Sequence, residues 1–313
     1  MAGKVKAICI SEKKGTEKKP VSQINIIEDH GLENDAHAGK WHRQVSLLPY
    51  EEREAFKKRG ADVEDGAFGE NLLISGIDFD QLVVGSHVHI GEVDLEITQR
   101  GKSCHSHCRI YHQVGECIMP RLGIFAKVIH GGLIHLEDEV TISPREDMRK
   151  RVAILTLSDK GSQGLRVDES GPYIKKYMEE KGYHVTSLDI LPDDQKQIEQ
   201  MLINLSDRCE NDLILTTGGT GLSPRDMTPE ATLKVATRNV PGIAEALRYE
   251  SMKYTNRAVL SRGASVIRHH TLIINLPGSL KAVKESLDII IDPLKHGLEI
   301  LKGEAHDCAR KDD

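Results

Sequence analysis

Residues 213–231 read LILTTGGTGLSPRDMTPEA. The apolar run Leu213–Thr217 is typical of a strand buried on both faces of a parallel sheet. It leads directly into glycines, which let backbone N–H groups approach an oxyanion closely. Arg225 and Asp226 follow just before Thr228-Pro229, a pair typical of a helix cap and first turn. The stretch therefore predicts a strand, a ligand-binding loop and a helix, with a cation for phosphates and a carboxylate for Mg²⁺.

The glycine loop taken alone fits a plain tight turn equally well. It is not a Walker A loop, because no Gly-Lys-Ser/Thr sequence ends it. It also lacks the full dinucleotide fingerprint, because Pro224 stands where the third glycine would be. Other parts of the sequence are needed to distinguish a plain tight turn from a ligand-binding loop.

Strands and helices alternate from residue 152 onward. Ser170 is a candidate helix cap, and a core stripe of apolar residues follows at helical spacing. This alternation predicts an α/β doubly wound sheet with helices on both faces. The predicted strands are Val152–Leu157, Val185–Leu191, Leu213–Thr217 and Thr271–Leu276; the stripe is Ile198, Met201, Leu202 and Leu205; later helices begin near Pro229, Pro241 and Leu280.

Polar residues follow three other predicted strands. Because the carboxyl ends of parallel strands face one edge of the sheet, we expect these loops to converge on one cleft. One of the two neighbouring acids Asp193 and Asp194 also fits a helix N-cap. The loops are Ser158-Asp159-Lys160-Gly161, Pro192-Asp193-Asp194 and Pro277-Gly278-Ser279-Leu280-Lys281.

The first half of the chain, residues 1–142, has a different pattern. Short runs rich in Val and Ile, with one helix at Glu51–Arg59, predict a mostly-β barrel domain. The polar stretch 143–151 is predicted to be a linker, 152–302 the second domain and 303–313 a tail. The predicted strands are Val5–Ile10, Val21–Ile27, Val45–Leu48, Leu82–Ile90, Val93–Gln99 and Phe125–Ile129.

Composition narrows the functional classes. The chain has 313 residues, which allows two domains with separate cores, and a formal net charge of -6. We therefore expect no nucleic-acid partner and no anionic membrane surface. The N-terminal residues lack the apolar run of a signal peptide, and the other apolar runs are strand-length. The six cysteines do not look like a disulfide framework, so we expect a protein of the reducing cytoplasm.

Three of the six cysteines, Cys104, Cys108 and Cys117, lie close together among histidines. The spacing lacks the second ligand pair of a zinc finger and does not fit a radical-enzyme iron–sulfur motif. A metal site, inert cysteines and a reactive thiol all stay open. The third is favoured, because Lys102, Arg109 and nearby histidines would lower the pKa of the Cys104 thiol.

Three further features of the first domain are more ambiguous. The basic run Lys13–Lys19 is predicted to be a solvated loop. Trp41, the only tryptophan, is predicted to anchor packing. Arg43 fits either a cofactor phosphate or a structural ion pair.

The motifs TTGGTG…RDMTPEA, LPDD, SDKGS and NLPGS together resemble the molybdopterin adenylyltransferase family over about residues 151–302. The resemblance implies that Asp193 and Asp226 are functional aspartates that manage Mg²⁺ and the reacting phosphates. Leu280 and Ser265 depart from residues common in the family. The residues implied or predicted to bind the substrates are Ser158, Asp159, Gly218, Gly219, Thr220, Gly221, Ser223, Arg225, Ser261, Arg262, Pro277, Gly278, Ser279 and Lys281.

The reaction that this resemblance implies is transfer of AMP from Mg-ATP to the terminal phosphate of molybdopterin. The products would be adenylyl-molybdopterin and pyrophosphate. Family resemblance also implies a homotrimer. Two alternatives remain: a non-catalytic molybdopterin-binding carrier, and a sulfur transferase centred on Cys104.

The first domain resembles a MOSC domain, named after the C-terminal domain of molybdenum-cofactor sulfurases, over about residues 4–142. The resemblance is carried by segments 35–47, 66–71, 101–104 and 115–126. It implies a β-barrel that binds the cofactor or carries sulfur, with Cys104 as the sulfur carrier.

Overall fold

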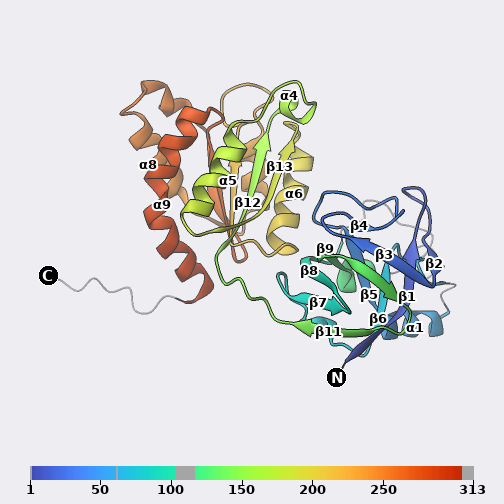
Figure 1. Ribbon diagram of the computed structural model, residues 1–313. Coiled ribbons are helices and arrows are strands. Elements are labelled where there is room, and N and C mark those ends of the chain that lie inside the picture. The colour runs from blue at the N-terminus through green and yellow to red at the C-terminus, as the bar shows by residue number, and fades with distance from the viewer. Residues whose placement is uncertain (1, 61–62, 103–116, 305–313) are drawn as a thin grey trace. The chain divides into compact units, whose positions relative to one another are not determined.

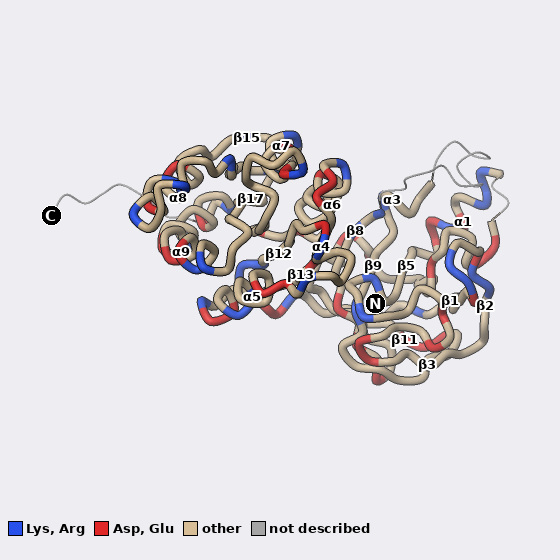
Figure 2. The backbone as a smooth tube through the Cα atoms, turned by 90° about the horizontal axis from the view of Figure 1, so that it is seen from above, with Lys and Arg blue, Asp and Glu red and all other residues tan. Residues whose placement is uncertain are grey.

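The computed structural model describes residues 2–60, 63–102 and 117–304 (Figure 1). The chain divides into two compact units between residues 148 and 149. Along the described residues of both units, Lys and Arg are interspersed with Asp and Glu (Figure 2). None of the described helices has the length and apolar character needed to cross a membrane.

A closed β-barrel forms the N-terminal unit, as the sequence predicts. Seven of the described strands pair in a ring, because the first strand in the order, β11, also pairs with β1. The ring runs β11 (Glu139–Ser143), β7 (His87–Ile90), β8 (Val93–Arg100), β9 (Ile124–His130), β5 (Val45–Pro49), β6 (Leu72–Ser75) and β1 (Gly3–Ile10). Outside it lie β2 (Lys19–Val21), β3 (Gln23–Ile27), β4 (Gly31–Leu32), β10 (Gly132–His135), α1 (Tyr50–Lys58), η1 (Phe79–Gln81) and α3 (Met119–Leu122).

Alternation along the strands fills the barrel. In β8, Val93, Leu95 and Ile97 are buried, while the residues between them are partly exposed. These three join the main core of the unit. A second cluster contains Phe56 of α1 and Phe125 of β9. The barrel therefore has one core of its own and a second one beneath α1.

Two predicted strands of this unit are wrong in extent. Val21–Ile27 is two strands, because β2 pairs with β1 whereas β3 pairs with β10 in a separate sheet. Of Leu82–Ile90 only His87–Ile90 is a strand. Gly85 has φ +92°, which turns the chain just before that strand. Neither break disturbs the apolar pattern, so periodicity alone does not reveal it.

The C-terminal unit is an α/β doubly wound sheet, as predicted. Its order is β13 (His184–Leu191), β12 (Arg151–Leu157), β14 (Leu213–Thr217), β17 (Thr271–Leu276), β16 (Ser265–Arg268) and β15 (Arg238–Asn239). The first four strands are parallel to one another, whereas β16 is antiparallel to β17 and β15 is antiparallel to β16. The sequence does not predict β15 and β16, which are short and lack a long apolar run.

Helices cover both faces of this sheet (Figure 1). Successive residues of a strand point to opposite faces. Ile154 thus packs in one cluster with α5, α8 and α9, and Leu155 packs in another with α6 and α7. The helices are α4 (Asp159–Ser162), α5 (Ser170–Glu180), α6 (Gln195–Asp207), α7 (Thr228–Val235), α8 (Pro241–Ser251), η2 (Asn256–Leu260) and α9 (Leu280–Lys302).

The order of the strands places a crevice between β12 and β14. The chain leaves β12 through α5, on one face, to reach β13. It then returns through α6, on the other face, to β14, on the opposite side of β12. Such a reversal opens a crevice outside the carboxyl ends of the two strands, where open α/β sheets bind ligands.

The prediction of a solvated loop is wrong for one lysine of the basic run. The Lys18 side chain is 2% exposed, and its Nζ lies 2.5 Å from Oδ2 of the buried Asp35. The backbone N–H of Ser11 and the Nδ2 of Asn71 also donate to that carboxylate.

Trp41 is not a buried packing anchor, because it is 43% exposed and its Nε1 donates to the backbone carbonyl of His37.

Replacing Lys18 with alanine should destabilise the N-terminal unit by about 3–5 kcal/mol, because Asp35 would keep a buried charge without its partner. Lys14→Ala, an exposed change in the same run, should stay within about 0.5 kcal/mol of wild type. Urea unfolding followed by Trp41 fluorescence measures this, because the only tryptophan lies in this unit. Equal stability of the two variants would contradict a structural role for the buried pair.

Candidate active site

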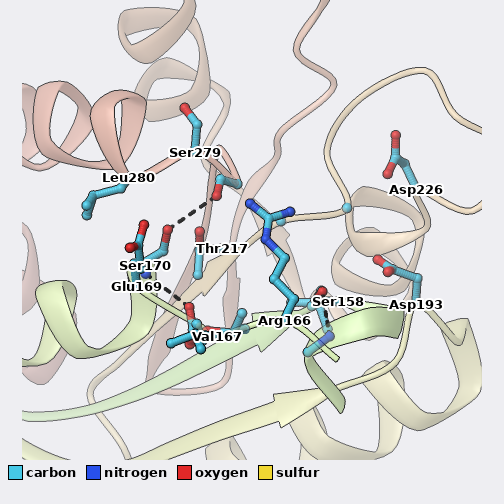
Figure 3. Close-up of a pocket in the computed structure, with 17 residues that line it drawn as sticks. Ser158, Arg166, Val167, Glu169, Ser170, Asp193, Thr217, Asp226, Ser279 and Leu280 are labelled. Carbon is cyan, nitrogen blue, oxygen red and sulfur yellow. Dashed lines mark hydrogen bonds between the residues drawn. The ribbon is translucent and has the colours of Figure 1, made fainter. Parts of the chain in front are cut away.

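Loops after four strands of the C-terminal unit surround one cavity of about 400 Å³ (Figure 3). β12, β13, β14 and β17 each contribute, so the expected convergence of strand ends is present. The lining residues are Thr156, Leu157, Ser158, Gly161, Arg166, Val167, Asp168, Glu169, Ser170, Asp193, Thr217, Gly218, Gly219, Asp226, Gly278, Ser279 and Leu280.

Two glycines of the loop after β14 occupy positions that no side chain fits. Gly218 has φ +99°, and a Cβ there would lie 2.4 Å from the carbonyl oxygen of Leu157. Gly219 has φ +63°, and its Cβ would lie 2.2 Å from Oγ1 of Thr228. Thr228, predicted to cap α7, instead donates its hydroxyl to the carbonyl of Gly218. The close approach of backbones therefore requires glycine at both positions.

The amides of this loop are available to a ligand. Within the described part of the chain, the backbone N–H groups of Gly219, Thr220 and Gly221 have no acceptor. The carbonyls of the loop, in contrast, are engaged by Arg262. Its backbone N–H donates to the Thr220 carbonyl at 3.0 Å, and its Nε to the Gly221 carbonyl at 2.6 Å. The loop thus presents donors that suit an oxyanion.

Arg262 supports the loop and does not line the cavity. Its guanidinium also donates to the Asp226 carbonyl at 2.5 Å and pairs with Glu230. The contacts join the two ends of the loop to the start of α7. Contact of Arg262 with a substrate stays a prediction.

Asp193 is held beside the loop by a reciprocal pair of hydrogen bonds. Its Oδ2 accepts from the Asp159 N–H, and Oδ1 of Asp159 accepts from the Asp193 N–H, both at 3.1 Å. The other oxygen, Oδ1 of Asp193, is buried and has no hydrogen-bond partner among the described residues. Burial raises the pKa of Asp193, and the negative charges of Asp159 and Asp226 raise it further. A cation beside Oδ1 would offset this cost.

Geometry distinguishes the two neighbouring acids. The Oδ1 of Asp194 accepts from the Gln197 N–H at 2.9 Å and caps α6. Asp194 is therefore the N-cap, and the side chain of Asp193 lines the cavity instead.

Asp226 lies at the far end of the same loop. Its Oδ2 accepts from the Ser223 N–H at 2.9 Å, and its own N–H donates to the Ser223 carbonyl. A Cβ at Gly221 would lie 2.9 Å from Oδ2 of Asp226, and one at Gly219 would lie 2.9 Å from Oδ1 of Asp193. Two carboxylates thus flank the loop with the available amides (Figure 3).

Arg225 is engaged by an acid rather than open to the cavity. Its Nη2 and Nε contact the two carboxylate oxygens of Asp159 at 2.7 and 3.0 Å. This bidentate bond holds the pKa of Asp159 below its ordinary value. The cavity lining does not include Asp159, Ser223, Arg225 or Lys281, so the contact of these residues with a ligand stays a prediction.

A second cavity, of about 290 Å³, has a more apolar lining. Thr220 and Gly221 line it, so the glycine loop contributes to both cavities. Ser261 and Pro277 of the predicted site residues also belong here. The remaining lining comes from Ala244, Leu247, Arg248, Ser251, Thr255, Arg257, Ala258, Leu260, Gly263, Asn275, Ala282, Glu285 and Ser286.

Comparison with known proteins matches each half of the chain to a different family. Residues 153–296 match the model of a probable molybdopterin binding domain, and residues 34–141 match the MOSC domain. The molybdopterin adenylyltransferase of Haemophilus influenzae is 40% identical over 49% of this chain and 78% of its own length. That of Helicobacter pylori is 38% identical over 49% of this chain and 88% of its own length. The chain belongs to the molybdopterin adenylyltransferase family.

Among solved structures, the molybdopterin biosynthesis enzyme MoaB of Thermus thermophilus is 44% identical to this chain, with a TM-score of 0.47. The match covers 49% of this chain and 97% of that one. The match to the molybdopterin binding domain, residues 153–296, lies within the C-terminal unit.

Sequence reasoning missed several residues that line the larger cavity. Asp168 caps α5, because its Oδ1 accepts from the N–H groups of Ser170 and Gly171 at 3.0 and 3.1 Å. The prediction of Ser170 as the cap is therefore wrong, and its hydroxyl donates to the Gly278 carbonyl instead. An aspartate commonly bonds the backbone N–H two residues further on in a turn, and this known signal would have identified Asp168, two residues before Ser170. Arg166 gave no such signal.

Two of the three clustered cysteines of the N-terminal unit are not among the residues that the structure describes. Cys104 and Cys108 lie outside the described residues, so the sulfur-carrier role stays a prediction. Within the described residues, no group of three or more His, Cys, Asp or Glu is arranged to hold a metal ion.

The motif at 66–71 is structural, because Glu70 accepts from the N–H groups of Gly66 and Phe68, and burial raises its pKa to about 7.

Asp193→Asn should make the C-terminal unit more stable at pH 7, because the neutral amide removes the cost of a buried negative charge. The folded pKa of Asp193 is raised, so wild type is free of this cost below the unfolded pKa of about 3.9 and incurs it as pH rises through the folded pKa. Calorimetric melting temperatures should therefore converge near pH 4 and separate at pH 7.

Asp194→Asn is the matched control, because asparagine caps a helix as well as aspartate does. It should show no comparable gain at pH 7. If Asp193→Asn melted below wild type at pH 7, the raised pKa would not reflect a cost to folding.

Proposed function

We propose that this chain transfers AMP from ATP to the terminal phosphate of molybdopterin, giving adenylyl-molybdopterin and pyrophosphate, in molybdenum-cofactor biosynthesis. The observation that carries the proposal is the glycine loop with available amides, which begins in the larger cavity beside the carboxylates of Asp193 and Asp226 and continues into the second cavity. The names of the relatives that match the C-terminal unit support it.

The chemistry needs no covalent protein nucleophile. An oxygen of the molybdopterin phosphate attacks the α-phosphorus of ATP, and pyrophosphate leaves. Positioning and charge neutralisation supply most of the rate in such transfers. The N–H groups of Gly219, Thr220 and Gly221 donate to phosphate oxygens, and Arg262 fixes the loop that carries them.

Asp193 and Asp226 fit a magnesium ion. Carboxylate oxygens suit this ion, and the remaining ligands come from water and substrate phosphates. The buried Oδ1 of Asp193, which has no donor among the described residues, is the observation that favours a cation there. Bound Mg²⁺ would neutralise charge on the phosphates.

The two cavities divide the substrates by chemistry. The larger one holds the hydroxyls of Ser158 and Ser279 and the two acids that would hold Mg²⁺, so it takes the reacting phosphates together with that ion. The second one has a more apolar lining, so it takes a flat ring of one substrate. Because the loop contributes to both, one substrate can extend from ring to phosphate along it.

We also propose a homotrimer, a cytoplasmic location and the domain bounds given above. The trimer is supported by exposed apolar side chains on the C-terminal unit. Tyr249, Tyr254 and Val259 are each more than 60% exposed, and Leu260 is 52% exposed. They lie on α8, on η2 and on the segment between these two helices, which contact each other, and exposed apolar groups that gather in one place mark interaction surfaces.

Sedimentation equilibrium should give three times the 34.8 kDa mass of one chain. Val259→Asp should shift the equilibrium toward monomer, because it places a charge on that surface. Leu133→Asp, at a residue of the other unit that is 53% exposed, should leave the mass unchanged. A monomeric wild type would refute the trimer.

A second candidate function is sulfur transfer centred on Cys104, which a mutation can separate from AMP transfer. A third is a non-catalytic carrier role, which the absence of ATP-dependent pyrophosphate release would indicate. Both carboxylates of the site are present, which favours the enzyme over a carrier. Cys104→Ser should abolish the activity of a sulfur transferase and leave AMP transfer intact.

Asp226→Ala should abolish AMP transfer while largely sparing molybdopterin binding. Asp226→Asn should also be inactive, although it keeps an acceptor for the Ser223 N–H, because the charge is lost. The measurement is ATP- and molybdopterin-dependent release of pyrophosphate, with adenylyl-molybdopterin identified by mass spectrometry. Wild-type rates in either variant would refute the role of the carboxylate, and an inactive wild type would refute the function.

A further inference from the structure

The larger cavity has an excess of negative charge. Four acids line it, namely Asp168, Glu169, Asp193 and Asp226. Arg166 is the one Lys or Arg among its described lining residues. Under the proposed function, both substrates bring phosphates into this cavity. Carboxylates repel phosphates, so a fixed cation inside the cavity has a large effect.

Other cations near the loop are engaged elsewhere or lie outside the lining. Arg225 forms its bidentate bond with Asp159. Arg262 contacts the loop carbonyls and Glu230. Lys281, the first-turn lysine of α9, does not line the cavity. Arg166 is thus the side-chain cation in position to meet a ligand.

Arg166 lies in a loop that is fixed on both sides of it. The Leu165 N–H donates to the Lys160 carbonyl at 2.9 Å. On the other side, Asp168 accepts from the Thr156 hydroxyl at 2.7 Å as well as from the first amides of α5. The anchors limit where the Arg166 side chain can reach, which lowers the entropy that binding would cost.

Figure 3 shows the Arg166 side chain extended across the cavity, between Thr217 and Ser279 on one side and Asp193 and Asp226 on the other. The guanidinium forms no hydrogen bond or ion pair with any residue in the described part of the chain. A planar guanidinium offers two parallel donors that match two phosphate oxygens.

We propose that Arg166 binds a terminal phosphate of a substrate in this cavity. The inference rests on the proposed function, because that function supplies the phosphates. Two phosphates have the required chemistry: the end of the ATP triphosphate, which leaves as pyrophosphate, and the phosphate of molybdopterin. In either case Arg166 holds an anion against the acidic lining and leaves the glycine amides to the reacting oxygens.

The test measures binding by calorimetry with the full chain, using ATP, inorganic pyrophosphate and molybdopterin separately. Arg166→Ala should weaken binding of the phosphate that Arg166 holds by about 10- to 100-fold, the range of a charge-assisted hydrogen bond. Arg166→Lys keeps the charge but not the fork, so its loss should be smaller. Lys160→Ala, which removes a neighbouring charge outside the lining, is the matched control and should bind as wild type does.

Selective weakening of ATP and pyrophosphate supports the proposal and assigns Arg166 to the triphosphate. Selective weakening of molybdopterin supports it and assigns Arg166 to that phosphate. Unchanged binding of all three ligands overturns it, as does equal weakening of all three with a lowered melting temperature, which indicates a structural role. A wild type that binds both substrates but transfers no AMP refutes the proposed function alone.

Discussion

The candidate site depends on one close approach, between the end of β14 and the end of β12. The backbone at Gly218 passes so near the Leu157 carbonyl that a Cβ would lie 2.4 Å from it. This contact holds the end of β14 against the end of β12 at the reversal of strand order, where Gly218 and Gly219 line the larger cavity. A side chain at Gly218 would separate the two strand ends, and the loop would then lose its place beside Asp193.

A second constraint is the free energy that folding loses when the acids beside the loop are brought close together and one of them is partly buried. Asp193 is held near Asp159 and Asp226, and one of its oxygens is buried without a donor among the described residues. Folding tolerates this because Arg262 and the amide contacts of Asp159 fix the surrounding backbone. The unfavourable charge is located where a cation and phosphates would relieve it, so stability and ligand binding oppose each other at this residue.

The sequence predicts the elements of the C-terminal unit well and the partners of its charged residues poorly. Buried strands and helix stripes are local patterns, so the four parallel strands are visible in the sequence. Arg225 meets an acid 66 positions away, and Arg262 meets one 32 positions away. No local pattern reports such pairs, which is why both arginines are predicted to bind phosphates. The edge strands β15 and β16 and the buried Lys18 were missed for the same reason, since long-range packing decides them.

What a cation does in this chain therefore depends on what lies opposite it rather than on the run of sequence around it. Lys18, in a basic run, is neutralised by Asp35 inside the barrel unit. Arg225 follows the glycine loop but faces Asp159. Arg166, in an unpatterned loop, faces a cavity lined by acids and hydroxyls. A chain with a net charge of -6 can still bind a polyanion, because the deciding charges are the few that form no ion pair with an acid of the described residues.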